Sequence, residues 1–165
     1  MRAILAFVVL LAGAAAAAAQ ADRIDGADIT QFGIYEHKLT GTEDASSTAT
    51  GMVRNVTYKF VSETTEVPAR RDIGFGFEYR IVGEPKGAKV PIRSVTIFPE
   101  GGVRNPKTGK TFLRSEYVGD KAIGELILKG YTLDSDWEIV PGTWTFQVWF
   151  GDKLLAEKVF TLTKP

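Results

Sequence analysis

The strongest pattern in the chain is an alternation of apolar with small or polar residues between positions 73 and 81. The apolar side chains share one phase: Ile73, Phe75, Phe77, Tyr79 and Ile81. A period of two is that of a β-strand with one buried face, whereas a helix would scatter these side chains around its circumference. Gly74 and Gly76 occupy the other phase. They leave a bare patch on the outward face, which we expect to admit a neighbouring aromatic side chain or a partner.

Seven further segments have strand-like patterns: residues 29–35, 52–61, 90–98, 111–118, 125–131, 143–150 and 154–163. Clusters of Gly, Pro and Asn mark turns between several of them, and residues 40–51, rich in Thr, Ser, Gly and Ala, predict a loop. About eight short strands without a convincing amphipathic helix predict an all-β sandwich or barrel.

Two of these segments raise a question of register. In residues 90–98 the inward phase slips between Ile92 and Val95, which predicts a β-bulge. The last two segments form a hairpin around Gly151-Asp152. A three-residue loop would place Trp144 opposite Phe160, whereas a two-residue loop would require a bulge near Glu157. The sequence leaves both arrangements open.

The final hairpin resembles that of bacterial immunoglobulin-like sandwiches. In that pattern Pro141-Gly142 begins the penultimate strand, an aromatic side chain enters the core, and Gly151-Asp152 turns into the last strand. With Phe32-Gly33-Ile34-Tyr35 near the start of the domain, residues 28–163 are similar to a family of small exported bacterial proteins of unknown function. The resemblance implies an all-β fold, an immunoglobulin-like antiparallel β-sandwich of about seven to nine strands. It implies no catalytic residues.

The first 21 residues have the layout of a secretory signal peptide. Arg2 precedes an apolar run over residues 4–11, and an alanine-rich stretch ends in Ala19-Gln20-Ala21. A positive start, a short hydrophobic core and small residues at the cleavage positions are the signature of such a peptide. We expect cleavage after Ala19 or Ala21.

Two alternatives to a cleaved peptide are less consistent with the sequence. A retained anchor would need about 20 apolar residues, but this run is mostly alanine and polar Gln20 and Asp22 follow at once. A lipoprotein would need a cysteine, and the chain has 0. We therefore expect residues 1–21 to be a signal peptide and residues 22–165 to be one domain, periplasmic or secreted, without a membrane span.

The composition narrows the classes of function. Lys and Arg number 20, as do Asp and Glu, so the chain lacks the concentrated basic character that nucleic-acid binding requires. Without cysteine, thiol chemistry, thiolate metal sites and disulfides are excluded, and the core alone must hold the domain together. Nothing in the sequence calls for a cofactor.

Catalytic and metal motifs are weak. His37 is the only histidine, so His-rich metal sites are excluded, and we expect it to flank a loop. Asp134, Asp136 and Glu138 lack the glycine and the spacing of a Ca²⁺ loop. We expect these acids to line a solvated turn. A hydrolase needs only two suitably separated carboxyl groups, so the many acids give no specific signal.

Two sets of residues are candidates for binding. Trp149 is predicted to face outward beside Gln147, an arrangement that suits stacking on a glycan or anchoring a protein partner. The competing interpretation makes Trp149 a packing residue, either over Gly74 and Gly76 or in the second layer of the sheet. The second set is a basic loop with Arg104 and Lys107, which could contact acidic polymers.

Taken together, the sequence predicts a non-catalytic binding or interaction module of the cell envelope, with a protein or glycan partner. One alternative is an envelope assembly subunit that presents an exposed edge strand to a partner chain. Another is a carboxylate-based hydrolase. A deep pocket with two convergent acids would favour the hydrolase, and an unpaired, uncharged edge would favour the assembly subunit.

Overall fold

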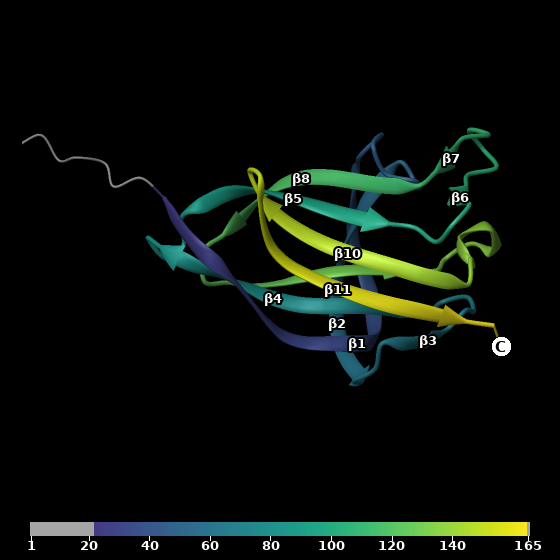
Figure 1. Cartoon of the computed structure of the whole chain (residues 1–165), viewed down its shortest axis with the longest axis horizontal. Helices are drawn as coiled ribbons and strands as arrows, with labels where there is room; N and C mark the ends of the chain where they lie inside the picture. Colours follow the sequence, from purple (N-terminus) through teal and green to yellow (C-terminus); the bar gives the residue numbers. More distant parts are fainter. Residues whose placement is uncertain (1–21, 165) are drawn as a thin grey trace, which may run out of the picture.

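The computed structural model describes residues 22–164, and in it two β-sheets pack face to face (Figure 1). The first sheet has the order β2-β1-β4-β9, with β1 (Arg23–Asp44), β2 (Met52–Ser62), β4 (Gly74–Glu84) and β9 (Leu126–Thr132). The second has the order β3-β11-β10-β5-β8, with β3 (Glu66–Pro68), β5 (Lys89–Ile97), β8 (Arg114–Ala122), β10 (Gly142–Phe150) and β11 (Lys153–Thr163). A small hairpin, β6 (Val103–Arg104) with β7 (Thr111–Phe112), and a 3-10 turn, η1 (Asp136–Glu138), complete the fold.

The predicted all-β sandwich is confirmed. Strand pairs are antiparallel except for the short β3, which runs parallel to β11. Three of the eleven strands in residues 22–164 have only two or three residues, which leaves the eight longer strands that the alternation indicated. The predicted signal peptide, residues 1–21, lies outside the described residues. Between residues 22 and 164 there is no helix long and apolar enough to cross a membrane.

The core lies between the two sheets and is dominated by aromatic side chains. Trp144 is fully buried, and its ring centroid lies 5.0 Å from those of Phe98 and Tyr131. Its indole nitrogen donates to the Val140 carbonyl at 2.9 Å. The inward phase of β4 is buried along its whole length, as the alternation predicts. With no disulfide in the chain, this burial of aromatic surface is the main source of stability.

The outward face of β4 is covered by the chain itself. A side chain at Gly74 or Gly130 would collide with the ring of Tyr35, which packs across both positions. The expectation that an aromatic side chain covers this patch is therefore confirmed at Gly74, whereas Gly76 faces the backbone of Lys129 and Gly130. The predicted packing of Trp149 over Gly74 and Gly76 is wrong, because Trp149 lies on β10 in the other sheet.

The first strand is much longer than the sequence indicated. It continues from Tyr35 to Asp44, pairs there with β2, and leaves only residues 45–51 as a loop, so the predicted loop over 40–51 is wrong in its first half. We call residues 35–62 the β1–β2 arm. The arm runs across the sandwich towards β8 (Figure 1). Its tip is attached there, since Ser47 Oγ donates to the Glu116 carbonyl at 2.6 Å and the Ala49 amide donates to Ser115 Oγ at 2.7 Å.

The hairpin of β10 and β11 combines features of both arrangements left open by the sequence. The turn has two residues, since Phe150 pairs with Lys153, and Trp144 nevertheless pairs with Phe160. The bulge that reconciles these pairs lies at Leu155, between the pairs Val148–Ala156 and Trp149–Leu154, and not near Glu157.

The bulge predicted in β5 is absent, because its pairing with β8 and β10 is continuous. Thr96 pairs with the inward Phe146, and Ser94 with the inward Val148, so both polar residues keep the inward phase of Ile92. Val95 pairs with Gln147 and lies on the outer face. The sequence pattern misled because the interior beneath this part of β5 is polar.

Candidate binding site

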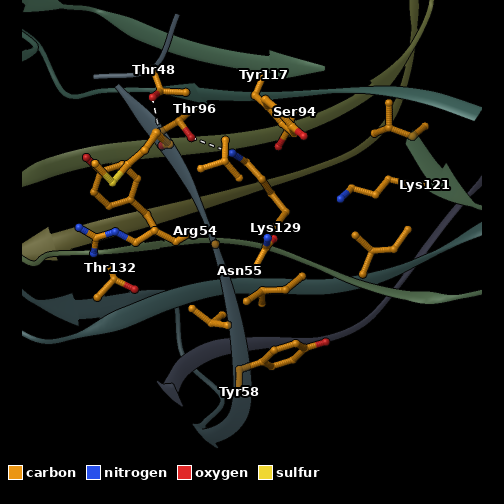
Figure 2. Close-up of a pocket in the computed structure, with 18 of the residues that line it drawn as sticks. Thr48, Arg54, Asn55, Tyr58, Ser94, Thr96, Tyr117, Lys121, Lys129 and Thr132 are labelled. Carbon is orange, nitrogen blue, oxygen red and sulfur yellow. Dashed lines mark hydrogen bonds between the residues drawn. The ribbon is translucent and has the colours of Figure 1, made fainter. Parts of the chain in front are cut away.

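A cavity of about 650 Å³ lies where β8 and β9, the edge strands of the two sheets, face each other beneath the β1–β2 arm. Its walls come from β5, β8 and β9, and residues of β2 pass across it (Figure 2). This volume falls in the range of small-molecule sites, about 300–1,000 Å³. The two sheets, which share no ladder at these edges, thus enclose a space large enough for a ligand.

Lys129 is the most unusual residue of the cavity. It lies in β9 between Ile127 and Tyr131, in the phase that faces the opposite sheet, and it is 8% exposed. Its ammonium group donates to Thr96 Oγ1 at 2.8 Å and lies 5.0 Å from the centroid of the Phe146 ring. Figure 2 shows this lysine reaching from β9 towards Thr96. Among residues 22–164 it forms no ion pair with a carboxylate.

Burial lowers the pKa of Lys129 to about 7, because the charged form loses its hydration in the interior. One hydroxyl and one aromatic face replace only part of that hydration. A lysine that titrates near neutrality inside a cavity is uncommon, and groups with strongly shifted pKa values concentrate at functional sites. The geometry and the charge together make this cavity the candidate binding site.

Hydroxyl groups line the wall opposite Lys129. Ser94 and Thr96 on β5 pair with Tyr117 and Ser115 on β8, so all four face inward. The Tyr117 hydroxyl donates to Glu43 Oε2 of the arm at 3.2 Å. These groups can both donate and accept hydrogen bonds, and a ligand here would meet adaptable polar partners.

The β1–β2 arm is held over the cavity by polar contacts at several points. Arg54 on β2 forms an ion pair with Asp134, which follows β9. Asn105 Nδ2 donates to the Ala49 carbonyl at 2.8 Å, which ties the arm to the β6–β7 hairpin. The arm therefore belongs to the site as one of its walls.

The structure places the predicted pair Trp149 and Gln147 on the outer face of β10. The Trp149 indole donates to Gln147 Oε1 at 3.0 Å, and Gln147 Nε2 donates to Glu157 Oε2 at 2.7 Å. The Arg93 guanidinium lies 5.0 Å from the centre of the Trp149 ring. Trp149 is half-buried on this face. These contacts make an ordered aromatic and polar surface that remains a candidate for binding.

Replacing Trp149 with alanine should change the free energy of unfolding by about 1 kcal/mol or less, since it removes a partly exposed ring and one surface hydrogen bond. The same change should weaken capture of a partner from envelope extract. Thermal unfolding and affinity capture measure the two effects, with Val159→Ala on the same face as the control. Global unfolding of the Trp149 variant would show that the ring is structural.

The predicted basic loop lies elsewhere. Arg104 and Lys107 are exposed in the β6–β7 hairpin, where Asn105 Oδ1 accepts from the Lys107 amide at 2.9 Å. This hairpin lies at one end of the sandwich, and the turn between β10 and β11, next to Trp149, lies at the other (Figure 1). The two predicted sets of residues are therefore not parts of one site.

The three clustered acids have separate partners. Asp134 pairs with Arg54, Asp136 pairs with Arg71 at 3.2 Å, and Glu138 accepts from the Tyr131 hydroxyl at 2.8 Å. The prediction of a solvated turn is wrong for Glu138, which is 1% exposed. Burial raises the pKa of this carboxyl. Over the described part of the chain, no group of three or more His, Asp or Glu side chains is arranged to hold a metal ion.

Sequence reasoning missed Lys129 and its neighbours, although two signals were present. Lys129 interrupts the apolar phase of β9, which made that strand look weak, and Ser94 and Thr96 interrupt the apolar phase of β5. Each of these polar interruptions, taken alone, is also typical of a short or irregular strand. Together they indicate a polar interior, but only if β5 and β9 are known to face each other across the sandwich.

Comparison with known proteins supports the same β-sandwich fold and assigns no biochemical activity to it. A family model described as a domain of unknown function, DUF3859, matches residues 25–162. The crystal structure of an immunoglobulin-like protein from Pseudomonas aeruginosa is similar, with 30% sequence identity and a TM-score of 0.61, and the match covers 88% of this chain and 100% of that one. No curated protein matches. The expected resemblance to an immunoglobulin-like family of unknown function is confirmed.

Proposed function

The chain belongs to the DUF3859 family of domains of unknown function, and on that premise we propose that it is a non-catalytic binding module of the cell envelope. The observation that carries this proposal is the cavity of about 650 Å³ between the two sheets. Its lining of hydroxyl, charged and apolar side chains offers a ligand both polar partners and apolar surface. A sandwich that encloses such a space can hold a ligand as well as present an outer surface to a partner.

The proposal of a non-catalytic role is supported by the state of the acids near the cavity. Asp134 is paired with Arg54, and Glu138 is held by the Tyr131 hydroxyl and, at 2.8 Å, by the Ser135 amide. A hydrolase would need two carboxyl groups that converge on one bond of the substrate. These two acids already have protein partners. Of the other three acids in the lining, Glu116 pairs with Arg114, and Asp120 and Glu125 are exposed, so the hydrolase is the weaker alternative.

Strand addition, which the assembly subunit would need, is opposed at two of the edge strands. The edge strand β8 carries Glu116, Asp120 and Lys121, and the edge strand β2 carries Arg54 and Lys59. Charged side chains along an edge oppose the addition of a further strand. The edge strand β9, by contrast, has Lys129 as its one charged residue, and that side chain is buried, so an assembly subunit would depend on the edge of β9.

The proposed location in the envelope rests on the N-terminal sequence. If the chain is exported, the mature protein should begin at Gln20 or Asp22 and should be recovered from the periplasm or the medium. Fractionation followed by intact mass measurement tests this prediction. A protein that retains Met1 and stays with the cytoplasmic fraction would contradict it.

The binding function itself can be tested by filling the cavity. The protein is incubated with a small-molecule extract of the envelope and examined by native mass spectrometry. Wild type should retain a bound molecule, and Ser94→Phe, which places a ring in the cavity, should not. Thr143→Phe, on the exposed face of β10, is the matched control. Equal retention by all three proteins, or by none, would refute the cavity as a binding site.

A further inference from the structure

The buried ammonium group of Lys129 has an incomplete set of partners. It has three N–H donors, and the structure shows one hydrogen bond, to Thr96 Oγ1 at 2.8 Å. Buried charges in proteins are normally paired with an opposite charge. Lys129 is one of the residues that line the cavity. A carboxylate that paired with its ammonium group would therefore lie in the cavity.

We propose that the cavity binds an organic monoanion, a carboxylate attached to an apolar body, whose carboxylate group pairs with Lys129. This inference rests on the proposed binding function and specifies the chemistry of its ligand. An ammonium–carboxylate contact supplies the missing charge, and hydrogen bonds to a charged group are among the strongest in proteins.

The charge balance of the cavity selects a monoanion. Its lining includes four cations, Arg54, Lys89, Lys121 and Lys129, against five carboxylates: Glu116, Asp120, Glu125, Asp134 and Glu138. Arg54 is already paired with Asp134. A ligand with several negative charges would find one deeply buried cation and a surplus of carboxylates around it. A single carboxylate matches the one lining ammonium that is buried, that of Lys129.

The apolar part of the lining selects the rest of the ligand. Ile92 and Ile127 enter the cavity from the two sheets, and Met52 enters it from the arm. These side chains cannot replace the hydration of a polar ligand, whereas the burial of apolar ligand surface against them is favourable. An apolar body beside the carboxylate therefore fits the space better than a sugar or a free inorganic anion.

The tyrosines around the cavity do not alter the pH dependence expected from Lys129. The tyrosines that line the cavity all have raised pKa values, with burial as the largest cause: Tyr35, Tyr58, Tyr79, Tyr117 and Tyr131. Their hydroxyls stay neutral around pH 7. Binding of a carboxylate should favour the ammonium form of Lys129, so the protein should take up a proton when the ligand binds near or above pH 7.

Titration calorimetry with decanoate and its neutral analogue decanamide tests the inference. Decanoate should bind wild type with proton uptake, seen as a dependence of the measured heat on the ionisation enthalpy of the buffer. Its affinity should fall about tenfold for each pH unit above 7, as the ammonium loses its proton. Lys129→Met should lose about 10- to 100-fold in affinity for decanoate and should show no proton uptake. Lys59→Met, an exposed lysine on β2 outside the cavity lining, should bind as wild type does.

The outcomes separate this inference from the function on which it rests. Equal binding of decanoate and decanamide, or unchanged decanoate binding by Lys129→Met, would overturn the anion site and leave a neutral ligand for the same cavity. Decanoate binding without proton uptake would also overturn it. If neither compound binds to wild type while envelope extract still yields an adduct that Ser94→Phe abolishes, the binding function stands and the proposed ligand class is wrong.

Discussion

Lys129→Met should raise the free energy of unfolding at pH 7 by about 3 kcal/mol, although it removes a side chain from the interior. The pKa of this lysine, about 7 in the folded protein, lies well below the value of 10.5 for a free lysine. Each unit of difference corresponds to about 1.4 kcal/mol, and the loss of the contacts with Thr96 and Phe146 offsets part of the gain. An apolar side chain of similar length carries no such charge, and replacing buried charges with apolar residues is often stabilising.

The difference between the pKa of Lys129 in the folded protein and its pKa in the unfolded chain also predicts how stability depends on pH. Between pH 7 and about pH 10 the unfolded chain keeps its proton on Lys129 and the folded protein has lost it, so the unfolded state binds more protons. Wild type should therefore gain stability as pH rises through this window, by up to about 1.4 kcal/mol per unit, and should lose that gain as pH falls towards 7. Chemical denaturation at pH 7 and pH 9.5 measures the effect.

Two variants test this predicted pH dependence. Lys129→Met should show a flatter profile than wild type over the same range, whereas Lys59→Met, at an exposed position, should keep the wild-type profile and lie within about 0.5 kcal/mol of it. Identical profiles of stability against pH for wild type and Lys129→Met would mean that Lys129 is hydrated in solution. Such a result would contradict the burial of its charge in the interior.

Gly76→Ala should destabilise the protein by about 3 kcal/mol and should disturb the cavity. Gly76 on β4 faces Gly130 on β9, and a Cβ at Gly76 would lie 2.5 Å from Gly130 Cα and closer still to the Lys129 carbonyl oxygen. Both obstacles are backbone atoms, so the strands themselves must move apart. Overpacking of this kind costs typically about 1–3 kcal/mol, and here it acts on the segment that carries Lys129.

Gly26→Ala is the matched control for this prediction. A Cβ at Gly26 would have no atom within 4 Å, so the substitution should be neutral or slightly stabilising. Thermal or urea unfolding of the two variants measures the difference. A Gly76 variant as stable as the Gly26 variant would show that β4 and β9 can separate freely, and the cavity wall would then not be rigid.

Because Lys129 is expected to lower the stability of the fold, its presence in the core must be explained by something other than stability. The core of this domain is otherwise apolar and aromatic, and Lys129 is among the few charged groups buried in it. Natural proteins carry such local violations mainly at functional sites. The cavity is therefore favoured over the outer surface of Trp149, whose contacts with Gln147 and Arg93 are ordinary for a half-buried aromatic side chain.

Much of the fold followed from the sequence because alternation is a local signal. The strand over residues 73–81 is buried on the expected face, since five apolar side chains in one phase can be satisfied only by a core. The polar arm was missed for the opposite reason. Residues 40–44 are paired with β2 but largely exposed, so no hydrophobic pattern distinguishes them from a loop.

By itself the sequence determined the all-β class, the inward phase of the main strands and the aromatic core. Each of these depends on the order of apolar residues along one segment. Only the tertiary structure decided that Tyr35 covers Gly74 and Gly130, that the β1–β2 arm reaches β8, and that Lys129 meets Thr96 inside a cavity. Those contacts join residues far apart in the chain, and their energies depend on burial and on distances between strands that no local pattern records.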